Sequence, residues 1–120
     1  MIEELVARVF ATRNTAHLVH WAAKGPGSYA QHVALDAFYS GLIDHIDKFV
    51  EMYQGAFGLM HAVTPVSVPT AKFTEHIATE AQWIEDNRDR LSQDVCALEN
   101  VLDELVGLYL TTYYKLKNLA

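Results

Sequence analysis

Residues 29–54 read YAQHVALDAFYSGLIDHIDKFVEMYQ, and the hydrophobic spacing of this stretch decides the fold. Its apolar side chains recur at steps of three and four residues, which is the period of an α-helix with one buried face. They are Leu35, Phe38, Leu42, Ile46, Phe49 and Tyr53. Ser28 stands before the stretch, where an N-cap is expected, and Gly55 and Gly58 follow it. The pattern therefore predicts a helix over about residues 29–54.

The same spacing predicts a helix on the N-terminal side of this stretch, from about Ile2 to Lys24. The residues expected to face inward are Ile2, Leu5, Val6, Val9, Ala16 and Trp21. Gly25-Pro26-Gly27 ends this helix, because glycine and proline interrupt helical hydrogen bonding.

Two further helices are expected on the C-terminal side. The third spans about Thr70 to Leu91, with Phe73, Ile77, Ala81 and Ile84 inward. Ser92 or Asp94 caps a fourth, whose buried seam is Leu98, Leu102, Leu105, Tyr109, Thr112 and Leu116. Between the second and third helices, Leu59 to Pro69 reads as a crossover loop, with prolines at 65 and 69. We therefore predict an all-α four-helix bundle with one longer crossover loop, and residues 1–120 as a single domain.

The composition of the chain limits the partners and the cellular location that we expect. No apolar run reaches the roughly 20 residues that span a bilayer, so we expect no membrane partner. The N-terminus is acidic and amphipathic, unlike a signal peptide, and Cys96 is the only cysteine. We therefore expect a cytoplasmic protein with Cys96 buried on a helix. The net charge of −6, with no cluster of cations, disfavours nucleic acid as a partner.

The second helix also carries a polar face. His32, Asp36, Ser40, Asp44, Asp47 and Glu51 fall within an arc of about 120° at 100° per residue. Such a stripe is ordinarily a solvated surface. This one contains no lysine or arginine, however, and like charges at four-residue spacing destabilise a helix, so a bound cation would relieve repulsion. His20, near the end of the first helix, is either a packed residue or a metal ligand. His45, His61 and His76 are assigned to surface or loop.

The segment His20-Trp21-Ala22-Ala23-Lys24-Gly25-Pro26, with His32, Tyr39, Asp47 and Glu51, resembles the signature of Dps-type miniferritins. That signature is H-W-x-x-K-G-P, then a histidine twelve residues after the first, an aspartate fifteen further on and a glutamate four beyond it. All four ligand positions are filled here, over about residues 15–58. The segment Ser28-Tyr29-Ala30-Gln31-His32 and the triplet Tyr53-Gln54-Gly55 also resemble short uncharacterised phage proteins. These resemblances imply that the cytoplasm in question is that of a bacterium or of a phage-infected host.

The miniferritin resemblance implies that the four-helix bundle is ferritin-like and that the protein oxidises iron. Ferrous iron would lose electrons to peroxide or dioxygen at a di-iron site, and zinc could substitute for iron there. The implied metal ligands and catalytic residues are His20, His32, Asp47 and Glu51. Trp21, Asp36 and Asp44 would lie around them. The lysine-rich DNA-binding tail and the extra crossover helix of that family are absent from this sequence.

Helix geometry places any such site between two chains. His32 and Asp47 are fifteen residues apart on one helix, about 22 Å at 1.5 Å per residue, so they cannot share a metal within one chain. An antiparallel two-fold dimer would bring His32 of one copy near Asp47 and Glu51 of the other, and a larger cage could follow. The competing interpretation is a non-catalytic helical interaction protein of the phage type, with a structural metal or none.

Overall fold

The computed structural model describes residues 1–119, and it contains five α-helices with no β-strand in that range. They are α1 (Ile2–Ala22), α2 (Ser28–Phe57), α3 (Phe73–Asp86), α4 (Arg88–Ser92) and α5 (Cys96–Asn118). The predicted all-helical class is confirmed. The predicted count of four becomes five, because the third expected helix is divided into α3 and α4.

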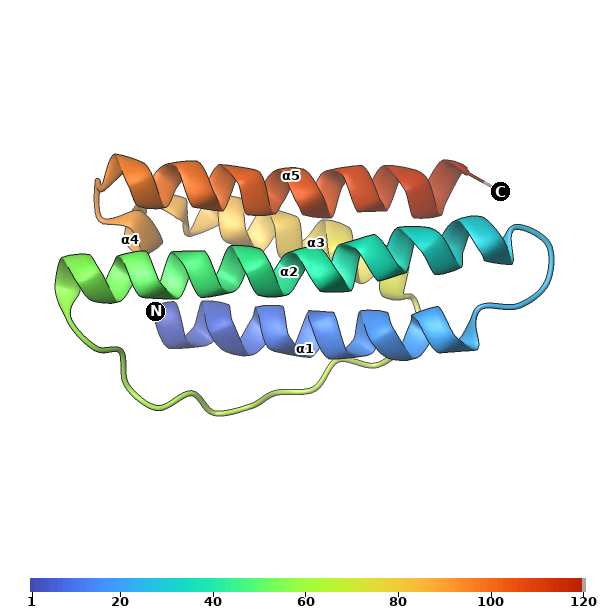
Figure 1. The fold of residues 1–120 in the computed structure, drawn as a ribbon, viewed down its shortest axis with the longest axis horizontal. Helices are drawn as coiled ribbons and strands as arrows, with labels where there is room; N and C mark the ends of the chain where they lie inside the picture. Colours follow the sequence, from blue (N-terminus) through green and yellow to red (C-terminus); the bar gives the residue numbers. More distant parts are fainter. Residues whose placement is uncertain (120) are drawn as a thin grey trace.

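The helices lie along one long axis in a molecule of 47 × 25 × 21 Å (Figure 1). α1 and α2 run in opposite directions, and the segment from residue 58 to residue 72 then travels back along the molecule. α3 therefore starts at the far end and runs in the same direction as α2, and α5 returns. α1 packs on α2 and α3, and α5 packs on the same two helices, while α4 packs on α5.

The core contains most of the residues that the helical spacing selected, including Ile2, Leu5, Val6, Val9 and Ala16 of α1, whereas Tyr53 and Leu116 are only partly buried. Leu35, Phe38, Leu42, Ile46, Phe49, Phe73, Ile77, Ala81, Ile84, Leu98, Leu102, Leu105, Tyr109 and Thr112 are all buried. Phe38 and Tyr109 meet edge to face, with ring centroids 5.2 Å apart. Gly41 allows α2 and α5 to approach closely, because a Cβ there would lie 3.0 Å from Leu108 Cδ2.

Two helix boundaries near the first turn differ from the prediction. α1 ends at Ala22 rather than Lys24, because Ala23 adopts an extended conformation. Ser28 does not act as an N-cap. Gly27 occupies that position with φ of 78°, a left-handed conformation that suits glycine, and Ser28 is already the first residue of α2. At its other end α2 continues through Gly55 to Phe57.

The predicted third helix begins later than Thr70 and breaks at Asn87. Asn87 Nδ2 donates to the carbonyl of Trp83 at 2.8 Å, and its own backbone leaves the helical conformation. Such local side-chain hydrogen bonds compete with the helix. Neither Ser92 nor Asp94 caps α5, whose N-cap is Val95. Gln93 and Asp94 instead form the turn, with φ of 49° and 65°.

Side-chain burial corrects three predictions. Trp21, expected in the core, is 68% exposed, and the adjacent His20 is buried in its place. Cys96, expected to be buried, is exposed at the start of α5. His76, assigned to surface or loop, lies half-buried on α3 against α1. Across residues 1–119, no helix combines the length and apolar character needed to cross a bilayer.

The crossover between α2 and α3 is tied to the helices at three points. The backbone N–H of Met60 donates to Gln54 Oε1 at 3.2 Å, and that of His61 donates to Glu3 Oε2 at 3.0 Å. Further along, Thr15 Oγ1 donates to the carbonyl of Val68 at 2.7 Å. The crossover is thereby held against α1 and the end of α2.

Candidate functional site

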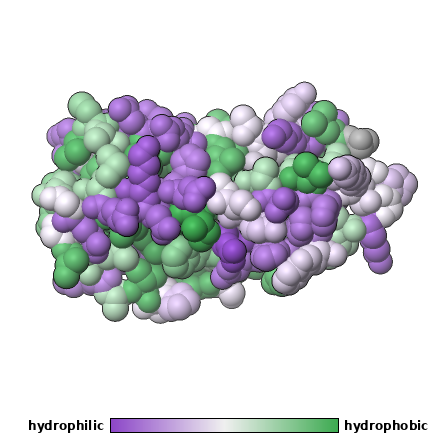
Figure 2. Space-filling view, viewed as in Figure 1, coloured by the Kyte–Doolittle hydropathy of each residue, from purple (hydrophilic) through white to green (hydrophobic). Residues whose placement is uncertain are grey.

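The predicted site residues occupy two ends of one surface, which we call the α1–α2 face. It comprises the outward side chains of α1 from Phe10 to Trp21 and of α2 from His32 to Glu51. Figure 2 shows the molecule from the same direction as Figure 1, with hydrophobic and hydrophilic groups interspersed. His20, Trp21 and His32 lie near the α1–α2 turn, whereas Asp47 and Glu51 lie in the second half of α2.

His20 and His32 contact each other directly. His20 Nδ1 donates to the carbonyl of His32 at 2.7 Å, and His32 Nδ1 donates to the carbonyl of His20 at 3.2 Å. A carbonyl oxygen only accepts, so each Nδ1 carries a proton and each neutral ring keeps its lone pair on Nε2. The rings stack, with centroids 3.7 Å apart and planes 21° apart. Because a ring lone pair lies in the ring plane, binding one shared ion would require the rings to turn out of this stack.

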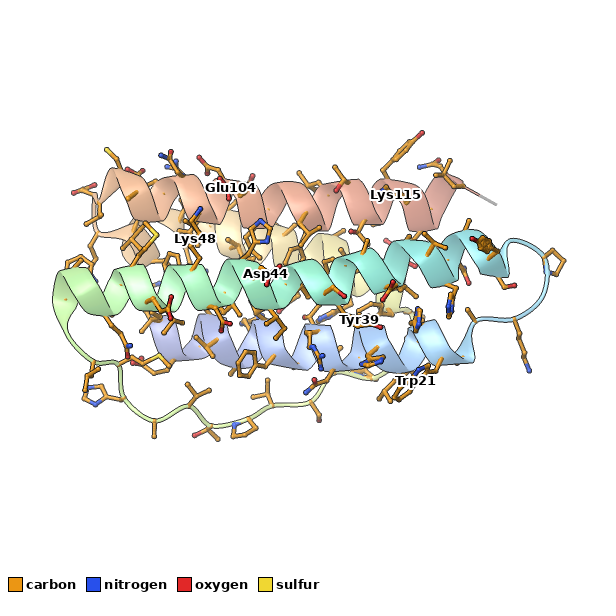
Figure 3. The ribbon with its side chains drawn as sticks, in the orientation of Figure 1. Trp21, Tyr39, Asp44, Lys48, Glu104 and Lys115 are labelled. Atoms are coloured by element: carbon orange, nitrogen blue, oxygen red, sulfur yellow. The ribbon has the colours of Figure 1, made fainter. Side chains whose placement is uncertain are left out.

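An aromatic cluster surrounds this histidine pair. His17 stacks on Tyr39 with centroids 4.1 Å apart, and its ring centroid lies 4.2 Å from that of Trp21. Asp36 raises the pKa of Tyr39, because the carboxylate accepts a hydrogen bond from the protonated phenol. Figure 3 shows Trp21 projecting from α1 and Tyr39 between α1 and α2. This end of the face is therefore rich in rings, with Trp21 the most accessible of those in contact with His17.

Asp47 and Glu51 stand at the edge of a pocket about 580 Å³ in volume. Its walls come from α1, α2 and the crossover, and all of its other lining residues except Asn14 are apolar. They are Val6, Ala7, Phe10, Ala11, Ile46, Val50, Met60, Val63, Pro65 and Val66. This end of the face combines an apolar hollow with two carboxylates.

Asp44 lies apart from both ends. It borders a small hollow shared with His45, Lys48 and Glu104, on the side of α2 that meets α5 (Figure 3). Lys48 Nζ is 4.0 Å from Glu104 Oε2, an exposed ion pair. Asp44 therefore has no contact within one chain to the histidine pair that it was expected to support.

Within residues 1–119, no three histidine, cysteine, aspartate or glutamate side chains are close enough to hold a metal ion together. The structure brings His20 and His32 together and leaves Asp47 and Glu51 at the other end of the face. This separation agrees with the argument from helix geometry that a site using all four residues needs two chains. The four-residue metal site stays a prediction.

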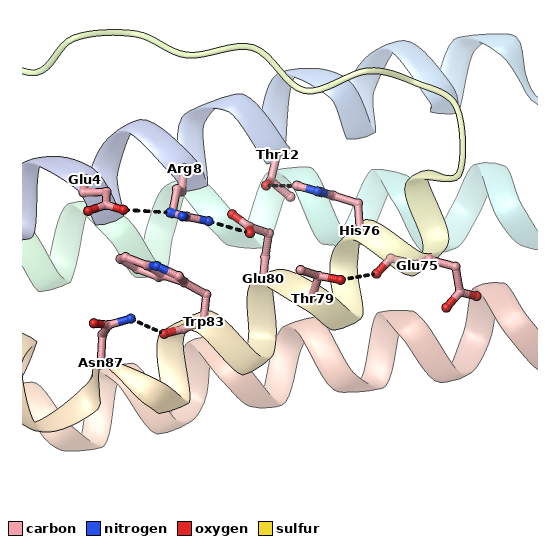
Figure 4. A network of polar contacts seen from close by, with 9 residues as sticks. All are labelled: Glu4, Arg8, Thr12, Glu75, His76, Thr79, Glu80, Trp83 and Asn87. Atoms are coloured by element: carbon pink, nitrogen blue, oxygen red, sulfur yellow. Dashed lines mark hydrogen bonds and ion pairs between the residues drawn. The ribbon is translucent and has the colours of Figure 1, made fainter.

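A polar network between α1 and α3 was missed from the sequence (Figure 4). Arg8 Nη1 donates to Glu80 Oε2 at 2.8 Å, and its guanidinium lies 4.2 Å from the centroid of the Trp83 ring. Beside this pair, Thr12 Oγ1 and His76 Nε2 are 3.0 Å apart. Glu80 is only 5% exposed. The signal in the sequence was its position: Glu80 falls three residues after Ile77 on the inward side of α3.

This network alters the ionisation of the groups around it. Burial lowers the pKa of His76, an effect that the Arg8 charge reinforces and the Glu80 charge opposes. Burial also raises the pKa of Tyr109, and the Glu80 carboxylate raises it further. The network thus holds a neutral imidazole and a neutral phenol near a buried ion pair, an arrangement that fixes α1 on α3.

Comparison with known proteins corrects the family assignment. A phage T4 protein described as an "Uncharacterized 14.6 kDa protein in mobD-ri intergenic region" is 29% identical over 116 residues, covering 95% of this chain and 86% of that protein. No solved structure matches the chain. The resemblance to short phage proteins is confirmed by the T4 match, whereas the resemblance to Dps-type miniferritins is wrong.

The finding that overturns the miniferritin resemblance is a family model that matches residues 20–116. Its match includes the histidine pair, α2, α3, α4 and nearly all of α5, whereas the miniferritin signature rested on a few positions in α1 and α2. The chain belongs to DUF5856, a family of unknown function.

Proposed function

We propose that this protein is a non-enzymatic helical interaction module of the phage type, which pairs with a second copy through the α1–α2 face. We further propose that its fold is a four-helix bundle, in which α3 and α4 together act as one broken helix. The pairwise packing of α1, α2, α3 and α5 around a common core supports this description.

The observation that carries the proposal is the self-complementarity of the α1–α2 face. One end presents imidazole and aromatic rings, and the other presents an apolar pocket with the carboxylates of Asp47 and Glu51. A two-fold contact uses the same patch on both copies, so its two ends must suit each other. A ring-rich end and an acidic, apolar end meet that requirement.

The register of the pairing follows from α2. His32 and Asp47 are about 22 Å apart along the helix, and the midpoint falls between Tyr39 and Ser40. A two-fold axis crossing α2 at that midpoint sets His32 of each copy opposite Asp47 of the other. It also keeps Asp47 and Glu51 of one copy away from the same two carboxylates of its partner, which avoids the like-charge repulsion that a parallel pairing would create between them.

Iron oxidation loses the basis on which it was expected, since that expectation came from the miniferritin resemblance. A structural metal at the paired face is a narrower proposal. It is supported by the Nε2 lone pairs of His20 and His32, which meet at one ion once the two rings turn out of their stack. Imidazole nitrogen together with carboxylate oxygen suits zinc or iron.

The experiment is a charge swap read by sedimentation equilibrium. His32→Glu places a carboxylate opposite Asp47 and Glu51 of the second copy, and should weaken the dimer by about tenfold or more, since about 1.4 kcal/mol is tenfold. Adding Asp47→Lys and Glu51→Lys to that variant should restore the dimer. His61→Glu, on the crossover, and Glu85→Lys, on α3, are the matched controls. A protein that stays monomeric at every concentration, or a dimer unaffected by the swaps, would refute the proposal.

A further inference from the structure

The pocket at the acidic end of the α1–α2 face is a hollow that no side chain of residues 1–119 fills. Phe10 is 44% exposed at its edge and Val66 is 53% exposed on the crossover side. Apolar surface of this kind at the edge of an open hollow is a common mark of a protein contact. About 580 Å³ is ample for a large aromatic side chain.

Trp21 is the large aromatic side chain at the other end of the same face. It is 68% exposed, and its ring rests on His17 rather than in the core. A tryptophan held on one side and open on the other is a preferred anchor in protein interfaces, because it buries much apolar area with few rotatable bonds. Its indole N–H needs an acceptor once buried.

We propose that Trp21 of a second copy occupies this pocket, so that each dimer contains two reciprocal tryptophan anchors. The register supports it. His20 stacks on His32, so Trp21 lies at about the level of His32 along the molecule. The axis between Tyr39 and Ser40 brings that level opposite Asp47 of the other copy, which is the level of the pocket.

The chemistry of the pocket suits an indole. The apolar walls from α1, α2 and the crossover receive the ring faces, and a carboxylate of Asp47 or Glu51 accepts the hydrogen bond of the indole N–H. A purely aliphatic anchor would leave these two carboxylates desolvated without a donor, and an acidic anchor would be repelled. The pocket therefore distinguishes tryptophan from leucine or glutamate.

This inference rests on the proposed function. Tryptophan fluorescence distinguishes a failure of the anchor from a failure of the pairing. Trp83→Phe leaves Trp21 as the only tryptophan. Concentrating this variant from monomer to dimer should move its emission to shorter wavelengths and reduce acrylamide quenching severalfold. Asn14→Phe, which narrows the pocket from its exposed rim, should abolish both changes. Asn100→Phe, the same substitution at an exposed position of α5, should leave both in place.

The possible outcomes test the tryptophan anchor and the proposed pairing separately. A dimer whose Trp21 emission and quenching match those of the monomer overturns the anchor and leaves the proposed pairing standing. A dimer in which Asn14→Phe has no effect on the emission change also overturns the anchor. A protein that never dimerises overturns both. Far-ultraviolet circular dichroism of each variant confirms that its helices are intact.

Discussion

His20 and His32 each donate a ring N–H to the other's backbone carbonyl, at 2.7 and 3.2 Å. These two bonds join the last turn of α1 to α2 across the intervening turn, and the stacked rings fill the space between the helices. The twelve-residue spacing of the two histidines therefore has a structural cause that does not depend on a metal. The two bonds hold the end of α1 against the start of α2.

The histidine pair should contribute unequally to stability. His20→Ala removes a hydrogen bond and a buried ring, and we expect a loss of about 2–3 kcal/mol in the free energy of unfolding. His32→Ala removes one bond from an exposed ring, and should cost about 1 kcal/mol. Urea unfolding at low protein concentration measures both, with His61→Ala on the exposed crossover as control. Equal losses for the two variants would contradict the burial difference.

The ion pair between Arg8 and Glu80 should be costly to break from one side. Arg8→Met leaves a buried carboxylate without its partner, at an expected cost of about 2–3 kcal/mol, below the usual range because Arg8 is partly hydrated. Replacing both residues, with Glu80→Leu, should recover part of the loss, since no buried charge remains. Arg88→Met, which breaks more hydrated pairs with Glu99 and Asp103, should cost much less than Arg8→Met. A double-mutant cycle showing no coupling would contradict this account.

Stability should fall on mild acidification because of His76. Burial lowers the pKa of His76 in the folded protein below its ordinary value of 6.5. Between these two pKa values, the unfolded chain binds a proton at His76 more readily than the folded protein does. The contribution of neutral, buried His76 to the free energy of unfolding is complete above pH 6.5. It is lost as the pH falls from 6.5 toward the folded-state pKa of His76. The melting temperature should thus drop between about pH 7.5 and about pH 5.5, and His76→Gln should reduce that drop. An identical pH profile for the variant would show that other groups cause it.

Metal binding by the four predicted ligands should require two chains. A His20→Ala, His32→Ala variant and an Asp47→Ala, Glu51→Ala variant should each fail to bind zinc. Their heterodimer retains one complete set, with both histidines from one copy and both carboxylates from the other, and should bind about half as much zinc as the wild-type dimer. Equilibrium dialysis after co-refolding measures this. Heterodimers that bind no zinc would refute a metal site between the two α1–α2 faces.

Helical periodicity was sufficient to predict the core. Phe38, Ile46 and Leu102 were assigned inward by spacing alone, and each is fully buried. Apolar side chains at three- and four-residue steps have no other way to leave water together, so the pattern specifies both the helix and its inner face. The predicted crossover between the second and third helices also agrees with the structure, since its prolines cannot continue a helix.

The mispredicted helix ends and buried positions lie where a polar side chain or the backbone conformation, and not hydrophobic burial, determines the structure. At the end of α1, hydropathy favoured Trp21 as the inward residue, but the sequence spacing from Ala16 favours His20, and spacing prevails. The break at Asn87 depends on one side-chain hydrogen bond, and the turn at Gln93 and Asp94 uses left-handed conformations without a glycine to signal them. The separation of the predicted ligands was foreseeable from helix rise, but the mutual bonding of His20 and His32 was not.

The crossover divides stability from recognition in a way that bears on how such proteins diverge. Its exposed residue Val66 forms part of the pocket wall, whereas Met60, Val63 and Val68 of the same segment pack against the core. Loops accept substitutions and insertions more readily than packed helices do. A lineage under pressure to change its partner can therefore vary this wall and keep its inherited core.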